Sequence, residues 1–394
     1  MKLTVKGYTL VELIVAMTVF MVVLMIASTS FDTILKHSSR LTRTEESNIE
    51  GVIGLEMLRH DLAQAGFGMF TEYDSTMPIP NYPEAASPLA AALNISATGG
   101  GVPRPIAARN NLVVTADSSF STVADSDYLA VRATSASTNR NAQRWTFVQY
   151  STTGKPPKKW PSAAENIEDG TKVVMVRRIF SSTGYVNRLV VDSSGNYSVS
   201  FDGNSAFTGV FRPVDPSDFI YVFGLTDSSP RMPFNRTDYF VAKGNVPQVC
   251  ANNTGVLYKT VVNHSNGQLE YIPVLDCVAN MQVVFGWDIN QDGKVDTYSN
   301  ADGSSVNGTG SVADVQATLG DAALLRQRLS MVKVYILTQV GKYDGGYTAT
   351  SPIRVGDDDE GSLTKDYILT GNMFNYRWKL YKIVVRPKNI VSIQ

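Results

Sequence analysis

The chain begins with an apolar run that needs cover from a membrane or from another protein. Residues 8–27 are almost all apolar or weakly polar, and Glu12 is the one acidic residue among them. Because a helix rises about 1.5 Å per residue, a run of this length spans the roughly 30 Å hydrocarbon core of a bilayer. Lys2 and Lys6 precede the run, and this charge pattern keeps the N-terminus cytoplasmic. We therefore expect the remainder of the chain outside the cytoplasm.

A secretory signal peptide and a plain membrane anchor are the two ordinary interpretations of such a run. Cleavage by general signal peptidase requires an A-x-A-like site after the run, and residues 27–30 (ASTS) match it poorly. The charged leader is also short. Both features favour a segment that stays attached to the mature protein.

The junction between the leader and the apolar run carries a more specific pattern. Residues 6–12 are KGYTLVE. They resemble the class III signal of type IV prepilins, in which a short basic leader ends in glycine and is followed by an aromatic residue and T-L-x-E. The resemblance implies that prepilin peptidase cleaves after Gly7 and that the new first residue, Tyr8, is N-methylated. A glycine before the scissile bond fits because it lets two backbones approach closely.

Glu12 is the residue of this pattern that is hardest to place in a membrane. A carboxylate deep in a bilayer costs about 2.5–3.5 kcal/mol on insertion scales and is kept mainly where it has a partner. Cleavage would give Tyr8 an ammonium group, and the resemblance implies that Glu12 pairs with the N-terminal amine of a neighbouring subunit during assembly. Because a buried carboxylate without a cation is unfavourable, this pair would favour correct register in a filament. The simpler alternative is that Glu12 lies near the headgroups and reaches the interface.

The apolar periodicity predicts one long helix from Tyr8 to Ala65. The first proline is Pro78, and Gly66 and Gly68 follow the last apolar step as a C-terminal stop. Apolar residues recur at steps of three and four at Ile49, Val52, Ile53, Leu55, Leu58, Leu62 and Ala65.

We therefore divide the chain into a stalk and a head. The parts are a basic leader (1–7), a transmembrane or filament-core helix (8–30), an amphipathic second half of the stalk helix (31–70) and a β-rich periplasmic head (71–394). The apolar stripe is expected to pack on the head. Charged residues, Asp61 among them, occupy much of the remaining helix surface, and His60 is expected to be a surface or packing residue.

The head is predicted to be antiparallel β-sheet, which makes the fold class α+β with a pilin-like long helix. Strand-like runs lie at 111–115, 128–132, 144–150, 172–180, 186–191, 197–201, 219–225, 237–243, 255–262, 270–273, 282–288, 331–339 and 376–386. Residues 190–199 (VVDSSGNYSV) predict a hairpin, and Ala313–Gln327 is a further helix candidate. Residues 74–110, rich in Pro, Ala, Ser and Gly, are expected to form a long surface excursion.

Several segments of the head resemble PilW-type minor pilins. They are 55–70 (LEMLRHDLAQAGFGMF), 276–298, 324–341 and 376–389, whereas 75–170 match little. The resemblance implies a minor pilin that primes type IV pilus assembly and sits in a tip complex with other minor pilins. Its partners would be prepilin peptidase, the major pilin and the inner-membrane assembly platform. It would wait in the inner membrane with a periplasmic head and then join the pilus.

Two alternatives share the same N-terminal signal. One is a J-type minor pseudopilin of a type II secretion system, although its head is typically smaller. The other is a pilin-anchored adhesin, for which residues 75–170 would be the first place to look.

An acidic turn at residues 288–296 predicts a weak structural calcium site. Asp288, Asn290, Asp292, the Lys294 carbonyl and Asp296 fall at positions 1, 3, 5, 7 and 9 of an EF-hand-like loop, with Gly293 at position 6. Position 12 is Ser299 rather than glutamate, and Asp302 is a replacement ligand. The alternative is an Asx/Gly turn held by its own hydrogen bonds.

Cys250 and Cys277 are the two cysteines, and the oxidising compartment favours a disulfide over a pair of buried thiols. With three histidines and no nucleophile elbow, phosphate loop or HExxH, we expect no enzyme and no required cofactor. The net charge of −1 indicates no basic field for nucleic acid. The run Asp357–Glu360 is expected to be a solvated loop.

Processing can be tested on the mature protein. We expect mass spectrometry of the purified mature protein to identify N-methylated Tyr8 as its first residue, because Gly7 marks the cleavage site. A mature chain that starts beyond Ser28 would contradict the prepilin interpretation and indicate an ordinary signal peptide.

Overall fold

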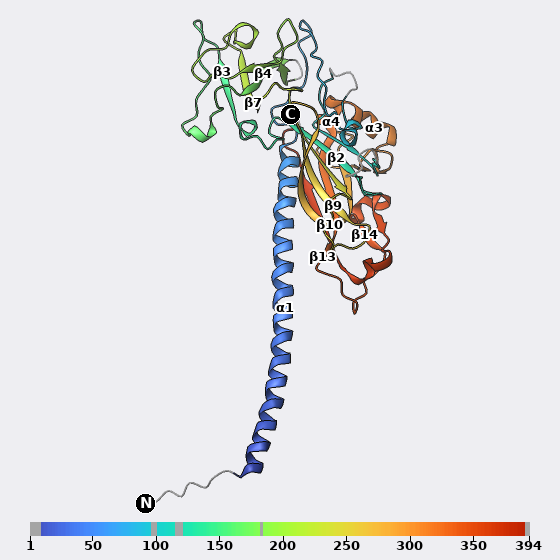
Figure 1. The fold of residues 1–394 in the computed structure, drawn as a ribbon. Helices are drawn as coiled ribbons and strands as arrows, with labels where there is room; N and C mark the ends of the chain where they lie inside the picture. Colours follow the sequence, from blue (N-terminus) through green and yellow to red (C-terminus); the bar gives the residue numbers. More distant parts are fainter. Residues whose placement is uncertain (1–8, 96–100, 115–120, 182–183, 391–394) are drawn as a thin grey trace, which may run out of the picture. The chain divides into compact units, whose positions relative to one another are not determined.

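The computed structural model describes residues 9–95, 101–114, 121–181 and 184–390, with the side chains of 32–50, 181 and 184 left out. The chain forms two compact units that divide between Glu50 and Gly51. The first helix, α1 (Leu10–Gln64), runs through that division (Figure 1). Each unit is described by itself.

The first unit consists of α1 up to Glu50. All side chains from Thr9 to Phe31 are exposed, among them Leu10 at 77% and Met25 at 72%. The predicted long apolar helix is therefore confirmed from Leu10 onward. Its apolar side chains have no cover from the described part of this chain.

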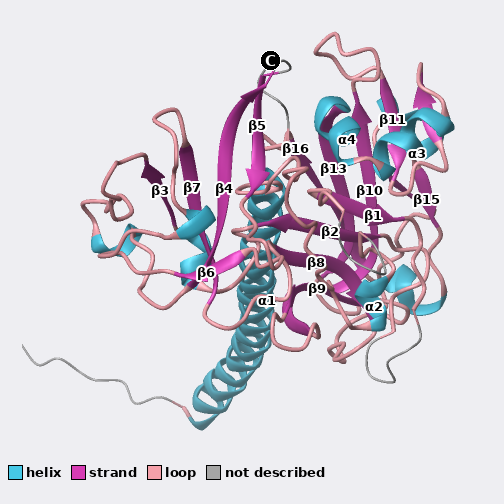
Figure 2. Cartoon of the chain, turned by 90° about the horizontal axis from the view of Figure 1, so that it is seen from above, coloured by secondary structure: helices cyan, strands magenta, loops and turns pink. Residues whose placement is uncertain are grey.

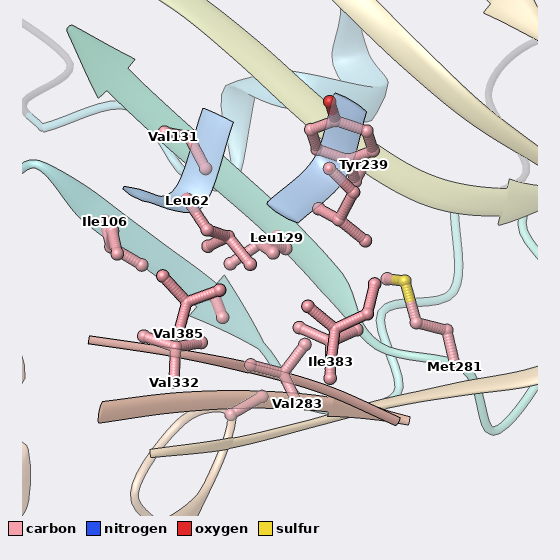
Figure 3. Packing of buried hydrophobic residues seen from close by; sticks show 14 of the residues in the cluster. Leu62, Ile106, Leu129, Val131, Tyr239, Met281, Val283, Val332, Ile383 and Val385 are labelled. Atoms are coloured by element: carbon pink, nitrogen blue, oxygen red, sulfur yellow. The ribbon is translucent and has the colours of Figure 1, made fainter. Parts of the chain in front are cut away.

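In the second unit the last turns of α1 cover the largest hydrophobic core. Leu55, Leu58 and Leu62 are buried in one cluster with sheet residues such as Val283 and Val332. Figure 3 shows Leu62, Val283 and Val332 in this cluster. The helix ends at Gln64, and Gly66 and Gly68 have φ of +83° and +68°. Glycine adopts this conformation without steric cost, so the predicted stop is confirmed.

The buried face of α1 differs in part from the predicted stripe. Val52 and Ile53 are 56% and 61% exposed, whereas Gly51 and Gly54 face the sheet. A Cβ at Gly54 would lie 2.5 Å from the carbonyl oxygen of Val274, closer than atoms can pack. The stripe at Val52 and Ile53 was therefore wrong because the close approach of helix and strand requires glycine on the buried side.

A nine-stranded antiparallel sheet forms the centre of this unit (Figure 2). Its order is β1 (Ile106–Arg109), β2 (Tyr128–Ala133), β8 (Asn235–Ala242), β9 (Gly255–Val262), β10 (Leu269–Trp287), β11 (Thr297–Asn300) and β12 (Val306–Gly308), while β13 (Leu329–Val340) pairs with β10 and with β16 (Arg377–Val385). The short helices α2 (Pro88–Ala91), α3 (Val312–Gly320) and α4 (Ala322–Arg328) and the hairpin of β14 (Ile353–Val355) and β15 (Lys365–Tyr367) complete this part.

A second sheet of five strands lies in the connection between β2 and β8. Its order is β3 (Trp145–Gln149), β7 (Phe219–Thr226), β4 (Lys172–Ser181) and β5 (Gly184–Leu189), with β6 (Ser198–Ser200) also pairing β4. All strand pairs of both sheets are antiparallel, as predicted for the α+β class.

Several predicted strands, a predicted hairpin and a predicted helix differ from the structure. Residues 111–114 form no strand, and β1 lies earlier, at 106–109. The runs 270–273 and 282–288 belong to one strand, β10, which β-bulges bend. The turn of the 190–199 hairpin forms, but β5 and β6 each pair with β4 and not with each other. Residues 313–327 form two helices because Asp321 caps a new N-terminus.

The described residues of 74–110 are not a surface excursion, because a buried ionic network at Glu84 holds this segment to β2 and β8. The Glu84 carboxylate lies 2.8 Å from Arg132 Nη2 and 3.0 Å from Arg236 Nη1, and Arg236 also pairs with Asp238 at 2.8 Å. All four side chains are at most 3% exposed. Burial alone would raise the pKa of Glu84, but the two arginines hold it below its usual value.

Asp127 fills a gap in the nine-stranded sheet. β9 pairs with β10 up to Val278 and β11 pairs from Val284, so the flank between them has no partner strand. There the Asp127 amide donates to the Met281 carbonyl at 2.8 Å, and its carboxylate accepts from the Val283 amide at 2.7 Å and the Asn111 amide at 3.1 Å. Burial raises the pKa of Asp127 to about 7.

This pKa predicts a pH-dependent contribution to stability. The folded state keeps a proton on Asp127 that the unfolded state releases near pH 3.8, so the contribution is complete below about pH 4 and lost by about pH 7. We expect the free energy of unfolding of wild type to fall relative to that of Asp127→Asn across this range, by at most about 1.4 kcal/mol per pH unit. Thermal melts of both proteins at several pH values measure the difference.

The comparison must be made between variants because His264 acts in the opposite direction. Burial lowers the pKa of His264 to about 4, so its contribution grows as the pH rises over the same range. Asp125→Asn is the matched control, since the Asp125 side chain is 70% exposed. An Asp127→Asn profile parallel to wild type would contradict the prediction.

Candidate functional site

The N-terminal site is centred on Thr9 and Glu12, while Gly7 and Tyr8 lie outside the described residues. The Thr9 amide donates to Glu12 Oε2 at 2.8 Å, and the Thr9 hydroxyl donates to the same oxygen at 3.0 Å. The Glu12 amide lies 3.3 Å from Thr9 Oγ1. These reciprocal contacts are a capping box, which satisfies donors that the first turn of a helix otherwise leaves unpaired.

The capping box gives the T-L-x-E pattern a local structural role. The Glu12 carboxylate lies in the first turn of α1, where the helix dipole favours negative charge. Both residues are exposed, so the carboxylate remains accessible to a cation from another molecule. The spacing of threonine and glutamate is the sequence signature of this cap.

The apolar segment of α1 is not covered by the described part of this chain. Among the described residues, Leu10–Phe31 is the one stretch of helix long and apolar enough to cross a membrane, and none of its most apolar window is buried. Length and composition therefore agree with membrane anchoring at this position.

The predicted calcium loop forms a tight turn after β10. Asp288 Oδ1 accepts from the Asp292 amide at 3.0 Å, Asp288 Oδ2 accepts from the Gly293 amide at 2.7 Å, and Asp292 Oδ1 accepts from the Lys294 amide at 2.9 Å. Asp296 Oδ2 accepts from two further amides, those of Ile289 and Asn290, at 3.0 and 3.1 Å.

These contacts determine how well the loop fits a cation. The oxygen-rich donor set suits calcium, and Asp288, Asn290, Asp292 and Asp296 share one turn. The same oxygens accept backbone hydrogen bonds, so the turn is held without a metal. Asp302 lies in the β11–β12 turn, where it accepts from the Ser304 amide. Calcium binding here stays a prediction.

The predicted disulfide between Cys250 and Cys277 is confirmed. The sulfur atoms are bonded at 2.03 Å, and both side chains are at most 9% exposed. The bond ties the β8–β9 connection to the middle of β10, where the strand bulges. By the chain-entropy model a loop of this length is worth about 3–4 kcal/mol.

The run Asp357–Glu360 is only in part the solvated loop that the sequence predicts, since Asp358 and Asp359 are exposed but Glu360 is not. Glu360 is fully buried, where it accepts from the Tyr335 hydroxyl at 2.5 Å and pairs with Lys333 at 3.0 Å. Lys333 also contacts Asp359 at 2.9 Å, and Lys382 pairs with Asp357. These carboxylates and the burial act in opposite directions, and the net effect raises the pKa of Lys333. Lys333 and Lys382 thus pair with the carboxylates of the one acidic cluster compact enough for a metal among the described residues.

Asp61 is a buried residue that the sequence analysis placed on the helix surface. Its carboxylate accepts from the Tyr239 hydroxyl at 2.6 Å and pairs with Lys259 at 2.6 Å, and Asp61 is 8% exposed. The signal was present, because Asp61 lies three residues after Leu58 and four before Ala65, on the buried face. His60 is exposed, as expected.

Comparison with known proteins adds two matches. Residues 238–389 match the family model described as type IV pilus-assembly protein W, and residues 3–28 match the prokaryotic N-terminal methylation motif. No curated protein and no solved structure matches the chain. The first match covers the strands from β8 to β16, and the second covers the leader and the apolar part of α1.

The calcium site can be tested on the whole protein. If the loop binds calcium with the affinity of extracellular sites, roughly 10⁻⁴–10⁻³ M, then 10 mM calcium stabilises the fold by about 1.4–2.7 kcal/mol. We expect calcium to raise the melting temperature of wild type and not that of Asp292→Ala.

Asp202→Ala is the matched control, because Asp202 also accepts an amide hydrogen bond in an exposed turn. It should respond to calcium as wild type does. Magnesium at the same concentration controls for ionic strength. If calcium does not change the melting temperature of wild type, the predicted calcium site is wrong.

Proposed function

Because this chain is a type IV pilus-assembly protein of the PilW type with a prepilin N-terminus, we propose that it is a minor pilin that primes pilus assembly. The prepilin motif implies processing by prepilin peptidase and a place in the pilus machinery. In our proposal the processed chain joins a tip complex with other minor pilins. The inner-membrane assembly platform then adds the major pilin beneath it.

The observation that carries this proposal is the uncovered apolar part of α1 behind an accessible carboxylate. The segment Leu10–Phe31 has no cover from the described residues of its own chain, so in our proposal lipid or other helices supply it. A bilayer serves while the chain waits in the inner membrane. Helices of neighbouring subunits offer an equally apolar environment in a filament, so transfer between the two costs little.

During this transfer, Glu12 would determine how the helix aligns with that of a neighbouring subunit. In the isolated chain its carboxylate closes the capping box with Thr9. Removal of the leader creates an ammonium group at Tyr8, four residues earlier. A neighbouring subunit's ammonium then neutralises Glu12 only when the two helices are correctly aligned, because a carboxylate buried without its cation is strongly unfavourable.

A structural role without catalysis fits the rest of the molecule. Many buried charged groups among the described residues of the head are paired with one another, as in the network of Glu84, Arg132, Arg236 and Asp238. Groups paired in this way rigidify a fold and are not available as a general acid or base. We propose a non-catalytic protein that resides in the inner membrane and then in the pilus.

A J-type pseudopilin of type II secretion is the main alternative. It would share the N-terminal motif and the long helix. The match of residues 238–389 to a pilus-assembly family favours the pilus.

The assembly role of Glu12 predicts a separation of processing from incorporation. We expect Glu12→Ala and Glu12→Gln to be cleaved normally but to enter pili about tenfold less or worse, because the pair with a neighbour's ammonium is lost. The measurements are the amount of chain in sheared pili and the number of pili per cell.

Glu56→Ala is the matched control, since Glu56 is an exposed carboxylate on the same helix that pairs only with Arg59 among the described residues. It should leave incorporation unchanged. Wild-type incorporation of Glu12→Ala would contradict the pairing role, and failed cleavage would show that Glu12 acts earlier, at processing.

A further inference from the structure

The five-stranded sheet lies in one long connection between two paired strands of the nine-stranded sheet. β2 and β8 pair directly through six residues, from Tyr128↔Phe240 to Ala133↔Asn235. The chain leaves the nine-stranded sheet after Ala133, forms the second sheet and returns at Asn235. Residues 134–234, which we term the inserted module, also lie outside the match to the pilus-assembly family. A role for its surface must therefore be argued from its own residues.

One face of this sheet is closed by its own loops. Its buried residues are Val148, Val173, Met175, Ile220 and Val222, packed with Ile167, Phe201 and Phe211. The inner end of the opposite face is also buried, with Val174, Val176, Leu189 and Phe223 against Phe70.

The outer end of that opposite face carries a group of aromatic side chains that nothing in the described chain covers completely. We term it the aromatic face, and it consists of Trp145, Phe147, Trp160, Phe219, Tyr221, Phe180 and Tyr185. Ring centroids of Phe147 and Phe219 are 4.9 Å apart at 23°, and Phe219 and Tyr221 are 4.9 Å apart. Phe180 and Tyr185 are 75% and 66% exposed. Large exposed rings mark an interaction surface.

Planar polar groups lie between these rings. The register aligns Gln149, Phe219, Arg178 and Asn187 across the four strands, so their side chains share the aromatic face. The Arg178 guanidinium lies 4.2 Å from the centroid of the Tyr185 ring, and its Nη1 donates to the Tyr221 hydroxyl at 3.3 Å. Within the described strands, this face presents one cation, two amides and no carboxylate.

We propose that the aromatic face binds an extended polysaccharide. The C–H faces of sugar rings pack on aromatic rings, while amides and a guanidinium pair with neighbouring hydroxyls. The charge of the face selects among polymers. A nucleic acid strand needs several cations at its phosphates, whereas the strands of this face supply one arginine, which two tyrosines already engage. Lys155, Lys158 and Lys159 are exposed in the segment that ends at Trp160, and the dT15 arm of the test decides whether they add a phosphate site. In a polysaccharide, the sugar rings can pack on the aromatic side chains and the hydroxyls can pair with the amides and the guanidinium. Such binding needs no further charged group on the aromatic face.

The test uses the full-length protein in a zwitterionic detergent without a sugar headgroup. The probes are cellohexaose, chitohexaose and hexagalacturonate, which separate neutral, acetamido and acidic sugars, together with dT15 and a dilution series of the protein alone. Binding is followed by tryptophan fluorescence, since Trp145 and Trp160 lie on the face, and by calorimetry. We expect one hexasaccharide to bind with little dependence on salt.

Phe180→Ala and Tyr185→Ala should each weaken that binding about tenfold, and both side chains are exposed enough for the fold to survive. Arg178→Ala should weaken it as well. The matched control is Tyr343→Ala, which removes a 58% exposed tyrosine that also packs edge-on to a neighbouring ring, that of Tyr376, outside the module. Unchanged thermal melts confirm folding of each variant.

The following outcomes would overturn the proposal. They are no binding of any hexasaccharide, binding that survives Phe180→Ala and Tyr185→Ala, salt-dependent binding of dT15 alone, and self-association that those substitutions abolish. Loss of polysaccharide binding would leave pilus incorporation intact, so failure here is distinguishable from failure of the pilin role.

Discussion

The close contact between the last turns of α1 and β10 is the constraint on which the second unit depends. Gly51 and Gly54 let the helix backbone approach Leu275 and Val274, and at Gly54 a Cβ would lie 2.5 Å from the Val274 carbonyl oxygen, so no larger side chain fits there. At this distance Leu55, Leu58 and Leu62 enter the main core, and Asp61 reaches Tyr239 and Lys259 beneath the helix. A buried ion pair contributes little net stability but penalises every other register. The apolar packing thus supplies the energy, and Asp61 fixes the position of the helix along the sheet.

Much of this organisation could be predicted from the sequence, because apolar periodicity and the residues that end helices or form turns are local features. The apolar run, the helix stop at Gly66 and Gly68 and most strands of the nine-stranded sheet followed from spacing and turn residues. The buried face of α1 was predicted only in part. Hydrophobicity predicts that Val52 is buried, but the close approach of the helix to β10 leaves room only for Gly54 on that side. Burial of Asp61 and Glu84 depends on partners that are distant in sequence, Lys259 for the first and Arg132 and Arg236 for the second. A pattern read along one segment cannot reveal such pairs.

The candidate sites divide in the same way. The capping box of Thr9 and Glu12 lies within four residues and has a sequence signature, and the disulfide followed from the compartment and the count of cysteines. The acidic run Asp357–Glu360 was predicted only in part, because the sequence does not show that Lys333 and Lys382 from β13 and β16 pair with Glu360 and Asp357. The aromatic face was equally hidden, since its rings come from β3, β4, β5 and β7 and meet only through the register of the sheet. In our proposals, assembly therefore depends on a pattern local to the N-terminus, and surface recognition on side chains that only the tertiary structure brings together.

The central claim is that the chain becomes a processed pilus subunit and does not remain a membrane protein. The most direct measurement is quantitative mass spectrometry of pili sheared from cells and sorted by length. A priming subunit at the tip predicts peptides of this chain in the pilus fraction, at a copy number per pilus that does not change with length. Peptides confined to the membrane fraction would contradict the claim, and a copy number that rises with length would contradict the tip position.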